Sequence, residues 1–118
     1  MPRSYISLEL RRLVAGRADC LCEYCLIPET NGVSFQVDHI ISVKHGGSTT
    51  TDNLCYACIY CNLQKGTDLG SINWQTGELV RFFNPRRDFW GEHFRLDEAV
   101  IQPLTDRYCR GDSTHLGF

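Results

Sequence analysis

Two pairs of cysteines in this chain have the same two-residue spacing, CEYC at residues 22–25 and CIYC at residues 58–61. Zinc prefers four ligands at the corners of a tetrahedron, and a two-residue gap lets one turn of backbone present two thiolates to the ion. Chance rarely produces two such pairs in a short chain, so four inert buried cysteines are the weaker alternative. The spacing predicts a closed, structural zinc site formed by Cys22, Cys25, Cys58 and Cys61.

The other three cysteines, Cys20, Cys55 and Cys109, have no partner in this pattern. The total of seven is odd and would leave one cysteine unpaired in any disulfide framework. No apolar stretch is long enough for a signal peptide or a membrane span, so we expect a cytoplasmic protein, in a compartment where disulfides are rare. We expect the three cysteines to be small buried apolar residues, as free cysteines usually are.

Between the cysteine pairs, an acid and an imidazole interrupt the apolar run VDHIISVKHGG at residues 37–47. Asp38 offers a hard carboxylate oxygen, and Asn62, which directly follows Cys61, offers a hard amide oxygen. Sparse oxygen ligation of this kind suits magnesium or manganese that keeps several waters and binds a substrate phosphate. The sequence therefore predicts a second, catalytic cation beside the zinc, bound by Asp38 and Asn62.

His39 is the candidate general base. Imidazole has an unperturbed pKa of about 6.5 and can take a proton from water near neutral pH. Asn53 closes the polar loop at residues 44–53 and could hold either that imidazole or the loop carbonyl that orients it. Neighbours on a strand point to opposite faces, so Asp38 and His39 can share one site only where the strand twists or ends.

The segments CEYC, VDHIISVKHGG, DNL and CIYCNLQKG, in this order, resemble the HNH endonucleases, in the subgroup framed by two zinc knuckles. The resemblance implies an α+β fold with a small ββα-metal core stapled by a structural zinc on four cysteines. We expect a single domain over residues 1–118, with an N-terminal helix, the motif core at residues 20–68 and a short β-rich C-terminal extension at residues 69–118.

The resemblance also implies a role for each polar motif residue. Asp38 would be a metal ligand, His39 the general base and Asn53 the orienting asparagine, while Asn62 stands where the family name has a histidine. An amide binds transition metals less well than imidazole does, so the catalytic cation should be Mg²⁺ or Mn²⁺ or another divalent ion. We expect an endonuclease acting on double-stranded DNA, without a membrane partner or a small-molecule cofactor. The oligomeric state is left open.

Outside the motif, the sequence predicts a helix over residues 7–15, capped by Ser7 and stopped by Gly16. The apolar face of this helix is Ile6, Leu10, Leu13 and Val14. We expect a strand within residues 33–43, and a sulfur-rich turn leading into a short helix within residues 55–66.

The C-terminal part contains extended segments at residues 78–83 and 93–104, separated by the turn formers Asn84 and Pro85. His45, His93 and His115 match no motif position, and we expect them on the surface or in packing.

The formal net charge of −2 neither supports nor excludes a nucleic-acid partner, because clustering of Lys and Arg matters more than their sum. Arg11, Arg12 and Arg17 lie close together near the start of the chain. Lys65 and the arginines are candidates for phosphate contacts, although most of them, taken singly, fit solvated surface charge.

Two other functions fit the cysteine pattern. The chain could be a non-catalytic zinc-stapled module that binds nucleic acid, or a zinc-stapled interaction domain without any nucleic-acid contact. Against the first stands the coincidence of Asp38, His39, Asn53 and Asn62, which DNA binding alone does not require. A gel-shift experiment at low salt would distinguish the interaction domain from the nuclease, because only the nuclease should retard DNA.

Overall fold

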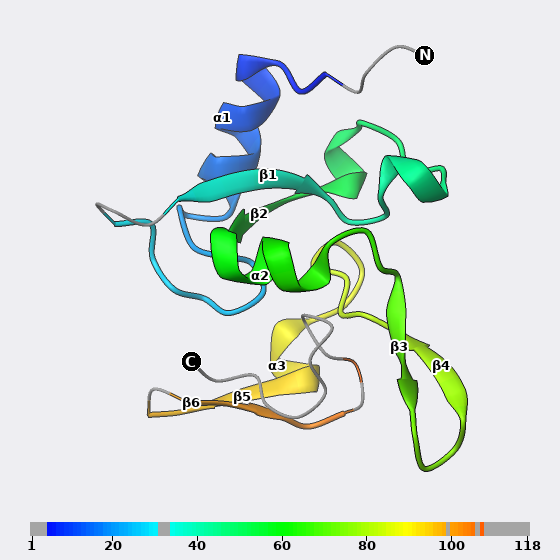
Figure 1. The fold of residues 1–118 in the computed structure, drawn as a ribbon. Coiled ribbons are helices and arrows are strands. Elements are labelled where there is room, and N and C mark those ends of the chain that lie inside the picture. The colour runs from blue at the N-terminus through cyan, green and yellow to red at the C-terminus, as the bar shows by residue number, and fades with distance from the viewer. Residues whose placement is uncertain (1–4, 31–33, 99, 106, 108–118) are drawn as a thin grey trace.

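A computed structural model describes residues 5–30, 34–98, 100–105 and 107. Its centre is an antiparallel hairpin of β1 (Phe35–His39) and β2 (Leu54–Cys58), followed directly by the short helix α2 (Ile59–Lys65). Figure 1 shows α1 (Leu8–Arg17) on one side of this hairpin and α2 on the other. The predicted ββα core is therefore confirmed.

The register of the hairpin assigns each residue of β1 to a face. Asp38 pairs with Cys55 and His39 with Leu54, and side chains that lie opposite each other in an antiparallel pair share a face. Leu54 and Tyr56 form a buried cluster with Val14 of α1. The other face, which carries Cys55 and Asp38, is the one turned toward α2.

Helix α1 begins as predicted, because the Ser7 hydroxyl oxygen accepts a hydrogen bond from the Leu10 backbone N–H at 3.2 Å. Two details of the prediction are wrong. Gly16 lies inside the helix, which continues to Arg17 and is capped by Ala18. Leu13 is 47 % exposed, because the stripe that contacts the hairpin is centred on Val14.

Strand β2 occupies a segment for which the sequence predicted a turn. All five of its residues are buried, so they show none of the apolar–polar alternation by which a half-exposed strand is recognised. The strand predicted within residues 33–43 is shorter than expected and ends at His39. The chain after it forms two 3-10 turns, η1 (Val43–His45) and η2 (Thr51–Asn53).

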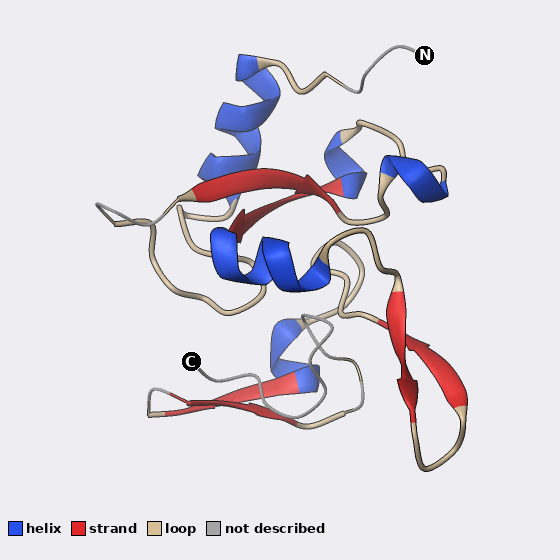
Figure 2. Cartoon of the chain, viewed as in Figure 1, coloured by secondary structure: helices blue, strands red, loops and turns tan. Residues whose placement is uncertain are grey.

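Two further hairpins follow. One pairs β3 (Gly70–Asn73) with β4 (Glu78–Arg81), and the other pairs β5 (Phe94–Asp97) with β6 (Val100–Pro103) after the single-turn helix α3 (Trp90–His93). Figure 2 shows the three small sheets as separate pairs of strands. The extended segments predicted at residues 78–83 and 93–104 are confirmed, whereas β3 and α3 were not predicted. Within the described residues, no helix has the length and apolarity needed to cross a membrane.

The C-terminal hairpin is attached to the core through aromatic packing. Phe83, Phe94 and Ile101 join the buried cluster that surrounds the paired cysteines. The Trp90 ring lies against Phe94, and its Nε1 donates a 2.8 Å hydrogen bond to the Tyr24 carbonyl oxygen. The extension therefore covers the cysteine cluster on the side away from α1.

Candidate metal centres and active site

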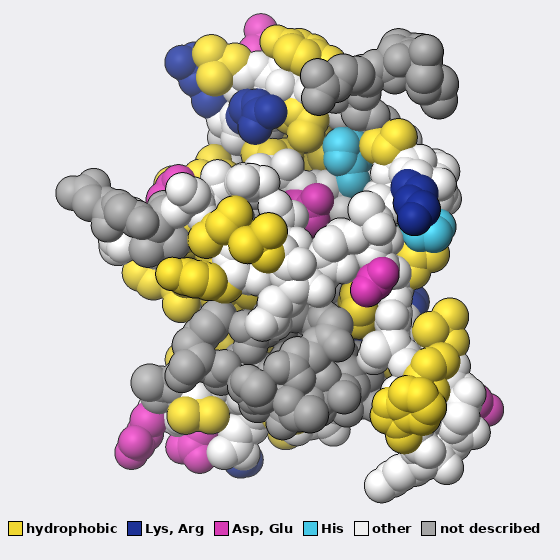
Figure 3. Space-filling model, viewed as in Figure 1, with side chains coloured by type: hydrophobic (Ala, Val, Ile, Leu, Met, Phe, Trp, Pro, Cys, Tyr) yellow, Lys and Arg dark blue, Asp and Glu magenta, His cyan; other side chains and the backbone are white. Residues whose placement is uncertain are grey.

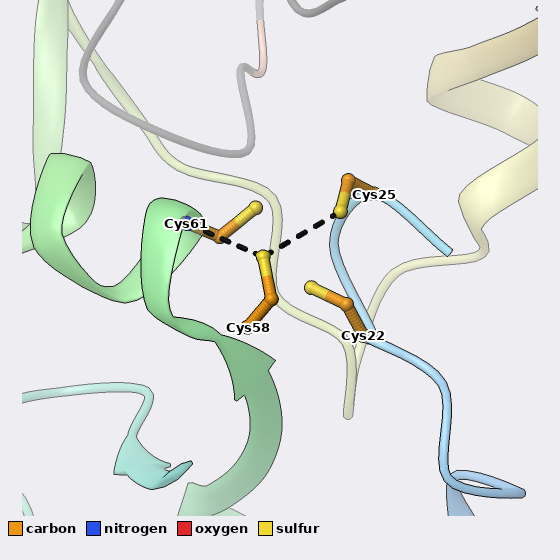
Figure 4. Close-up of side chains that lie close together, drawn as sticks. All are labelled: Cys22, Cys25, Cys58 and Cys61. Carbon is orange, nitrogen blue, oxygen red and sulfur yellow. Dashed lines mark hydrogen bonds between the residues drawn. The ribbon is translucent and has the colours of Figure 1, made fainter. Parts of the chain in front are cut away.

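The four cysteines of the two knuckles converge at one buried point, with all Sγ atoms within 4.8 Å of one another. Figure 4 shows their side chains directed toward a common centre from the turn after α1 and from the start of α2. A tetrahedron with metal–sulfur distances of about 2.3 Å has edges of about 3.8 Å. The Cys25–Cys58 Sγ distance is 3.8 Å, so the donor set fits a structural zinc.

Local backbone geometry holds each knuckle open. The Leu26 N–H donates to the Cys22 carbonyl, and Leu26 itself has a positive φ of 66° that turns the chain back. In the second knuckle, Cys58 is the N-cap of α2, and its Sγ accepts the Cys61 N–H at 3.5 Å. The neighbouring knuckle thiols and this N–H hold the pKa of Cys58 well below its usual range.

The remaining cysteines differ from one another. Cys20 is exposed, so the prediction of a buried residue is wrong; it lies after the end of α1 in a turn with a positive φ of 55°. Cys55 is buried as predicted, and its Sγ donates to the Tyr24 hydroxyl oxygen at 3.4 Å. Burial raises the pKa of Cys55 to about 12, so it stays a thiol. Cys109 lies outside the described residues.

Asp38 has an unsatisfied buried oxygen. Its side chain is 20 % exposed, but Oδ2 is buried and has no hydrogen-bond partner among the described residues. The Nζ atom of Lys65, a side chain only 2 % exposed, lies 3.8 Å from this oxygen. Burial raises the pKa of Asp38 above its ordinary value, and the charge of Lys65 acts against that shift. A partly accessible carboxylate with one oxygen that forms no hydrogen bond is a donor that a divalent cation can use.

Asn62 lies on the same side of the molecule as Asp38. Its Nδ2 donates a 2.7 Å hydrogen bond to Oε1 of Gln36, which leaves the Asn62 Oδ1 as the oxygen available to a cation. Gln36 precedes Asp38 by two residues and therefore shares its face of β1. Sequence reasoning missed Gln36, although its spacing from Asp38 in a strand was the available signal.

His39 ends β1, and the register places it on the opposite face from Asp38. The structure therefore does not bring the two side chains together through the strand. Nε2 of His39 lies 2.9 Å from the Thr49 hydroxyl, a partner that the sequence did not indicate. The His39 carbonyl oxygen accepts a 3.3 Å hydrogen bond from Lys65 Nζ, so the backbone at this residue is tied to α2.

Asn53 fixes the loop that follows His39. Its Oδ1 accepts the Ile41 N–H at 2.9 Å, while its Nδ2 donates to the carbonyls of Ile41 and Ser48 at 3.0 and 2.8 Å. Of the two partners considered for Asn53, the loop carbonyls are therefore the ones it bonds. Gly47 is required here, because a Cβ would lie 1.7 Å from the Ile41 carbonyl oxygen.

Lys65 was predicted to contact phosphate, and its geometry gives that prediction no support. Its side chain is buried and bonded to β1. The histidines outside the motif agree with the expectation of surface or packing roles where they are described. His45 is exposed in η1, and the His93 ring packs on Phe83 while its Nδ1 lies 2.7 Å from the Thr105 hydroxyl. His115 lies outside the described residues.

Residues 22–68 match the protein-family model described as HNH endonuclease. The matched span begins at the first zinc-site cysteine and includes Asp38, His39, Asn53 and Asn62. Neither the curated proteins nor the solved structures gave a significant match to the chain.

Proposed function

We propose that this protein is a metal-dependent endonuclease that hydrolyses phosphodiester bonds in DNA, because residues 22–68 match the family model described as HNH endonuclease. The observation that carries the proposal is the buried Oδ2 of Asp38, which has no hydrogen-bond partner within the described residues. The Lys65 ammonium, 3.8 Å away, balances the charge of this oxygen but lies beyond hydrogen-bond distance, which leaves a lone pair for a cation.

In the proposed site, Asp38 and Asn62 hold the catalytic divalent cation, Mg²⁺ or Mn²⁺. A cation there supplies Lewis-acid stabilisation of the charge that develops on the phosphate and the leaving oxygen. The zinc on the four cysteines is structural and has no open position for substrate. Support for Asn62 comes from its bond to Gln36, which holds the amide on the face of β1 that carries Asp38.

In the same proposal, His39 removes the proton from the attacking water. Its Nε2 is engaged with Thr49, so Nδ1 is the nitrogen that accepts this proton. Asn53 acts as a positioning residue, because it binds the backbone of Ile41, two residues after the base.

The test is a plasmid-nicking assay with added magnesium, manganese or nickel. His39→Ala should lower the cleavage rate by roughly 10² to 10⁴ fold while DNA affinity and the circular dichroism spectrum stay unchanged, because a general base acts mainly in the transition state. His45→Ala is the matched control, since this exposed histidine lies on the adjacent turn η1.

Equal cleavage by wild type and His39→Ala would contradict the assignment of the base. DNA binding by the wild type without nicking, across all three metals, would instead favour the non-catalytic zinc module.

A further inference from the structure

We propose that the groove between α1 and the β1–β2 hairpin binds the phosphate backbone of the DNA substrate through Arg11 and Arg12. The inference rests on the proposed function and names the residues by which the substrate is held. The groove has a volume of about 250 Å³ and is lined by Arg11, Arg12, Ala15, Phe35, Val37 and Tyr56.

The first argument is that these two guanidinium groups are exposed and not neutralised. Among the described residues, neither Arg11 nor Arg12 forms an ion pair with a carboxylate; the only bond of either side chain is a 3.3 Å hydrogen bond from Arg11 Nε to the Ile6 carbonyl. A guanidinium presents a planar fork of donors that matches two phosphate oxygens.

Four other arginines of the described residues are already engaged. Arg81 and Arg107 bind Asp88, and Arg86 binds Glu23. Arg17 donates to the Leu54 carbonyl oxygen at 2.6 Å. An arginine that must first leave a carboxylate gains less from a phosphate, so Arg11 and Arg12 are better phosphate ligands than Arg81, Arg86 and Arg107.

The second argument is the position of the groove relative to His39. Val37 lines the groove and lies two residues before His39 on the same face of β1, a distance of about 7 Å along a strand. One strand of B-DNA advances about 3.4 Å per nucleotide. Phosphates bound at Arg11 and Arg12 would therefore lie within a few nucleotides of the one facing His39. Figure 3 shows basic side chains over α1 on the same face of the molecule as a surface histidine.

The third argument is the chemistry of the groove wall. No acidic side chain of the described residues lines it, and the Phe35 ring lies against the Tyr56 ring at a centroid distance of 5.2 Å. Glu29, whose carboxylate accepts a 2.6 Å hydrogen bond from the Tyr56 hydroxyl, is not among the lining residues. Cationic donors above an uncharged aromatic floor complement a backbone that alternates phosphates with sugars.

The experiment measures the affinity of the full-length, zinc-loaded protein for a 20-base-pair DNA duplex, without added catalytic cation so that no cleavage occurs. The Arg11→Gln/Arg12→Gln variant should bind roughly tenfold or more weakly at moderate salt, and the slope of log K against log salt should fall by about 1.8, since each phosphate contact on B-DNA contributes about 0.9. The Arg11→Lys/Arg12→Lys variant should retain most of the slope, because an ammonium also neutralises phosphate.

The matched control is Arg87→Gln/Arg95→Gln, which removes the same charge from two exposed arginines outside the groove. This control should leave the slope unchanged. Equal slopes for the two glutamine variants would overturn the groove, and the endonuclease proposal would still stand if His39→Ala loses cleavage. Failure of the wild type both to bind and to cleave DNA would overturn the endonuclease proposal and, with it, the groove.

Discussion

At the scale of single residues, buried polar side chains determine the geometry around the end of β1. Asn53 is 9 % exposed, and the oxygen and nitrogen of its side-chain amide both hydrogen-bond to loop backbone. These bonds satisfy backbone groups that have no strand partner after β1 ends. Asp38 is the opposite case, because one of its oxygens is buried without a hydrogen-bond partner among the described residues. We interpret the satisfied residue as a positioning element and the unsatisfied one as a ligand.

The first prediction at this scale concerns Asn62. If Asn62 ligates the catalytic cation, Asn62→His keeps a ligand in place but exchanges a hard oxygen for an imidazole nitrogen, so the metal preference should move from magnesium toward nickel, cobalt or zinc. Cleavage measured across titrations of each metal checks this.

Two truncations serve as comparisons for that titration. Asn62→Ala should raise the concentration of every cation needed for cleavage, and Asp38→Ala should raise it further, because Asp38 is the charged ligand. Metal profiles that stay unchanged in all three variants would remove Asn62 and Asp38 from the site. A loss of roughly 1 kcal/mol of stability without any metal dependence would instead identify Asn62 as a residue of the helix start only.

At the scale of elements, the contact between α2 and β1 depends on a buried ammonium. Lys65 is 2 % exposed, donates to the His39 carbonyl and lies 3.8 Å from Asp38 Oδ2. It is the last residue of α2, so it joins the end of the helix to the end of the strand. The same side chain therefore stabilises the hairpin–helix packing and supplies a positive charge next to the proposed ligand.

We predict that Lys65→Met lowers the free energy of unfolding by about 3 kcal/mol, because it leaves the Asp38 carboxylate without its buried counter-ion. Adding Asp38→Asn should recover part of that loss, since no unpaired buried charge is then left. Urea unfolding of both single variants and the double variant gives the coupling energy. Strictly additive losses of stability in the double variant would contradict the pairing. Lys44→Met, on the exposed turn η1, is the control and should leave the stability unchanged.

A second link between elements is the ion-pair cluster around Asp88, which joins the end of β4 to the turn before α3. Arg81 forms a two-pronged bond to Asp88 at 2.8 and 2.9 Å, and Arg107 and the Asn84 N–H bind the same carboxylate. Burial by itself raises the pKa of Asp88, but these bonds outweigh it and lower the pKa from 3.8 to about 2.

A depressed carboxyl pKa in the folded state contributes stability above the unfolded pKa, and that stability is lost as pH falls. For Asp88 it amounts to about 2 kcal/mol at neutral pH and should disappear between about pH 4 and pH 2. Asp88→Asn should therefore lower stability at pH 7 and flatten the pH dependence in that range. Denaturation measured at several pH values checks this, and Asp68→Asn, at an exposed position, is the control. If Asp88→Asn lost stability on acidification just as the wild type does, the assignment would be contradicted.

At the scale of the whole molecule, the cysteine cluster is where the separate parts meet. Cys22 comes from the turn after α1, Cys58 from the start of α2, and Phe83 and Phe94 from the C-terminal extension, and all four belong to one buried cluster. Within the described residues each of the three sheets has two strands, and a two-stranded hairpin is marginally stable alone in water. A metal at this junction is therefore expected to supply much of the folding free energy.

We predict that Cys61→Ser unfolds the protein or strongly destabilises it, because three thiolates cannot close the zinc tetrahedron. Cys20→Ser is the matched control, since Cys20 is exposed and outside the cluster. Thermal melts followed by circular dichroism, together with zinc content by elemental analysis, measure both effects. A zinc-free wild type, or equal melting temperatures for the two variants, would refute a structural zinc.

The sequence by itself determined the features that depend on local spacing. Two CxxC pairs predicted the metal cluster, and Ser7 predicted the start of α1, because a cysteine knuckle and an N-cap are each built within a few consecutive residues. The cysteine pairs and the polar residues Asp38, His39, Asn53 and Asn62, in their order along the chain, carried the resemblance to the HNH endonucleases, and residues 22–68 match that family model.

The tertiary structure alone decided the features that depend on contacts between distant residues. It buried β2 on both faces and so removed the alternation that identifies a strand, it enclosed the Lys65 side chain between α2 and β1, and it exposed Cys20. It also set α1 against the hairpin, which creates the groove of Arg11 and Arg12. Burial and pairing of a side chain are set by what packs against it, and that information is spread over residues far apart in the chain.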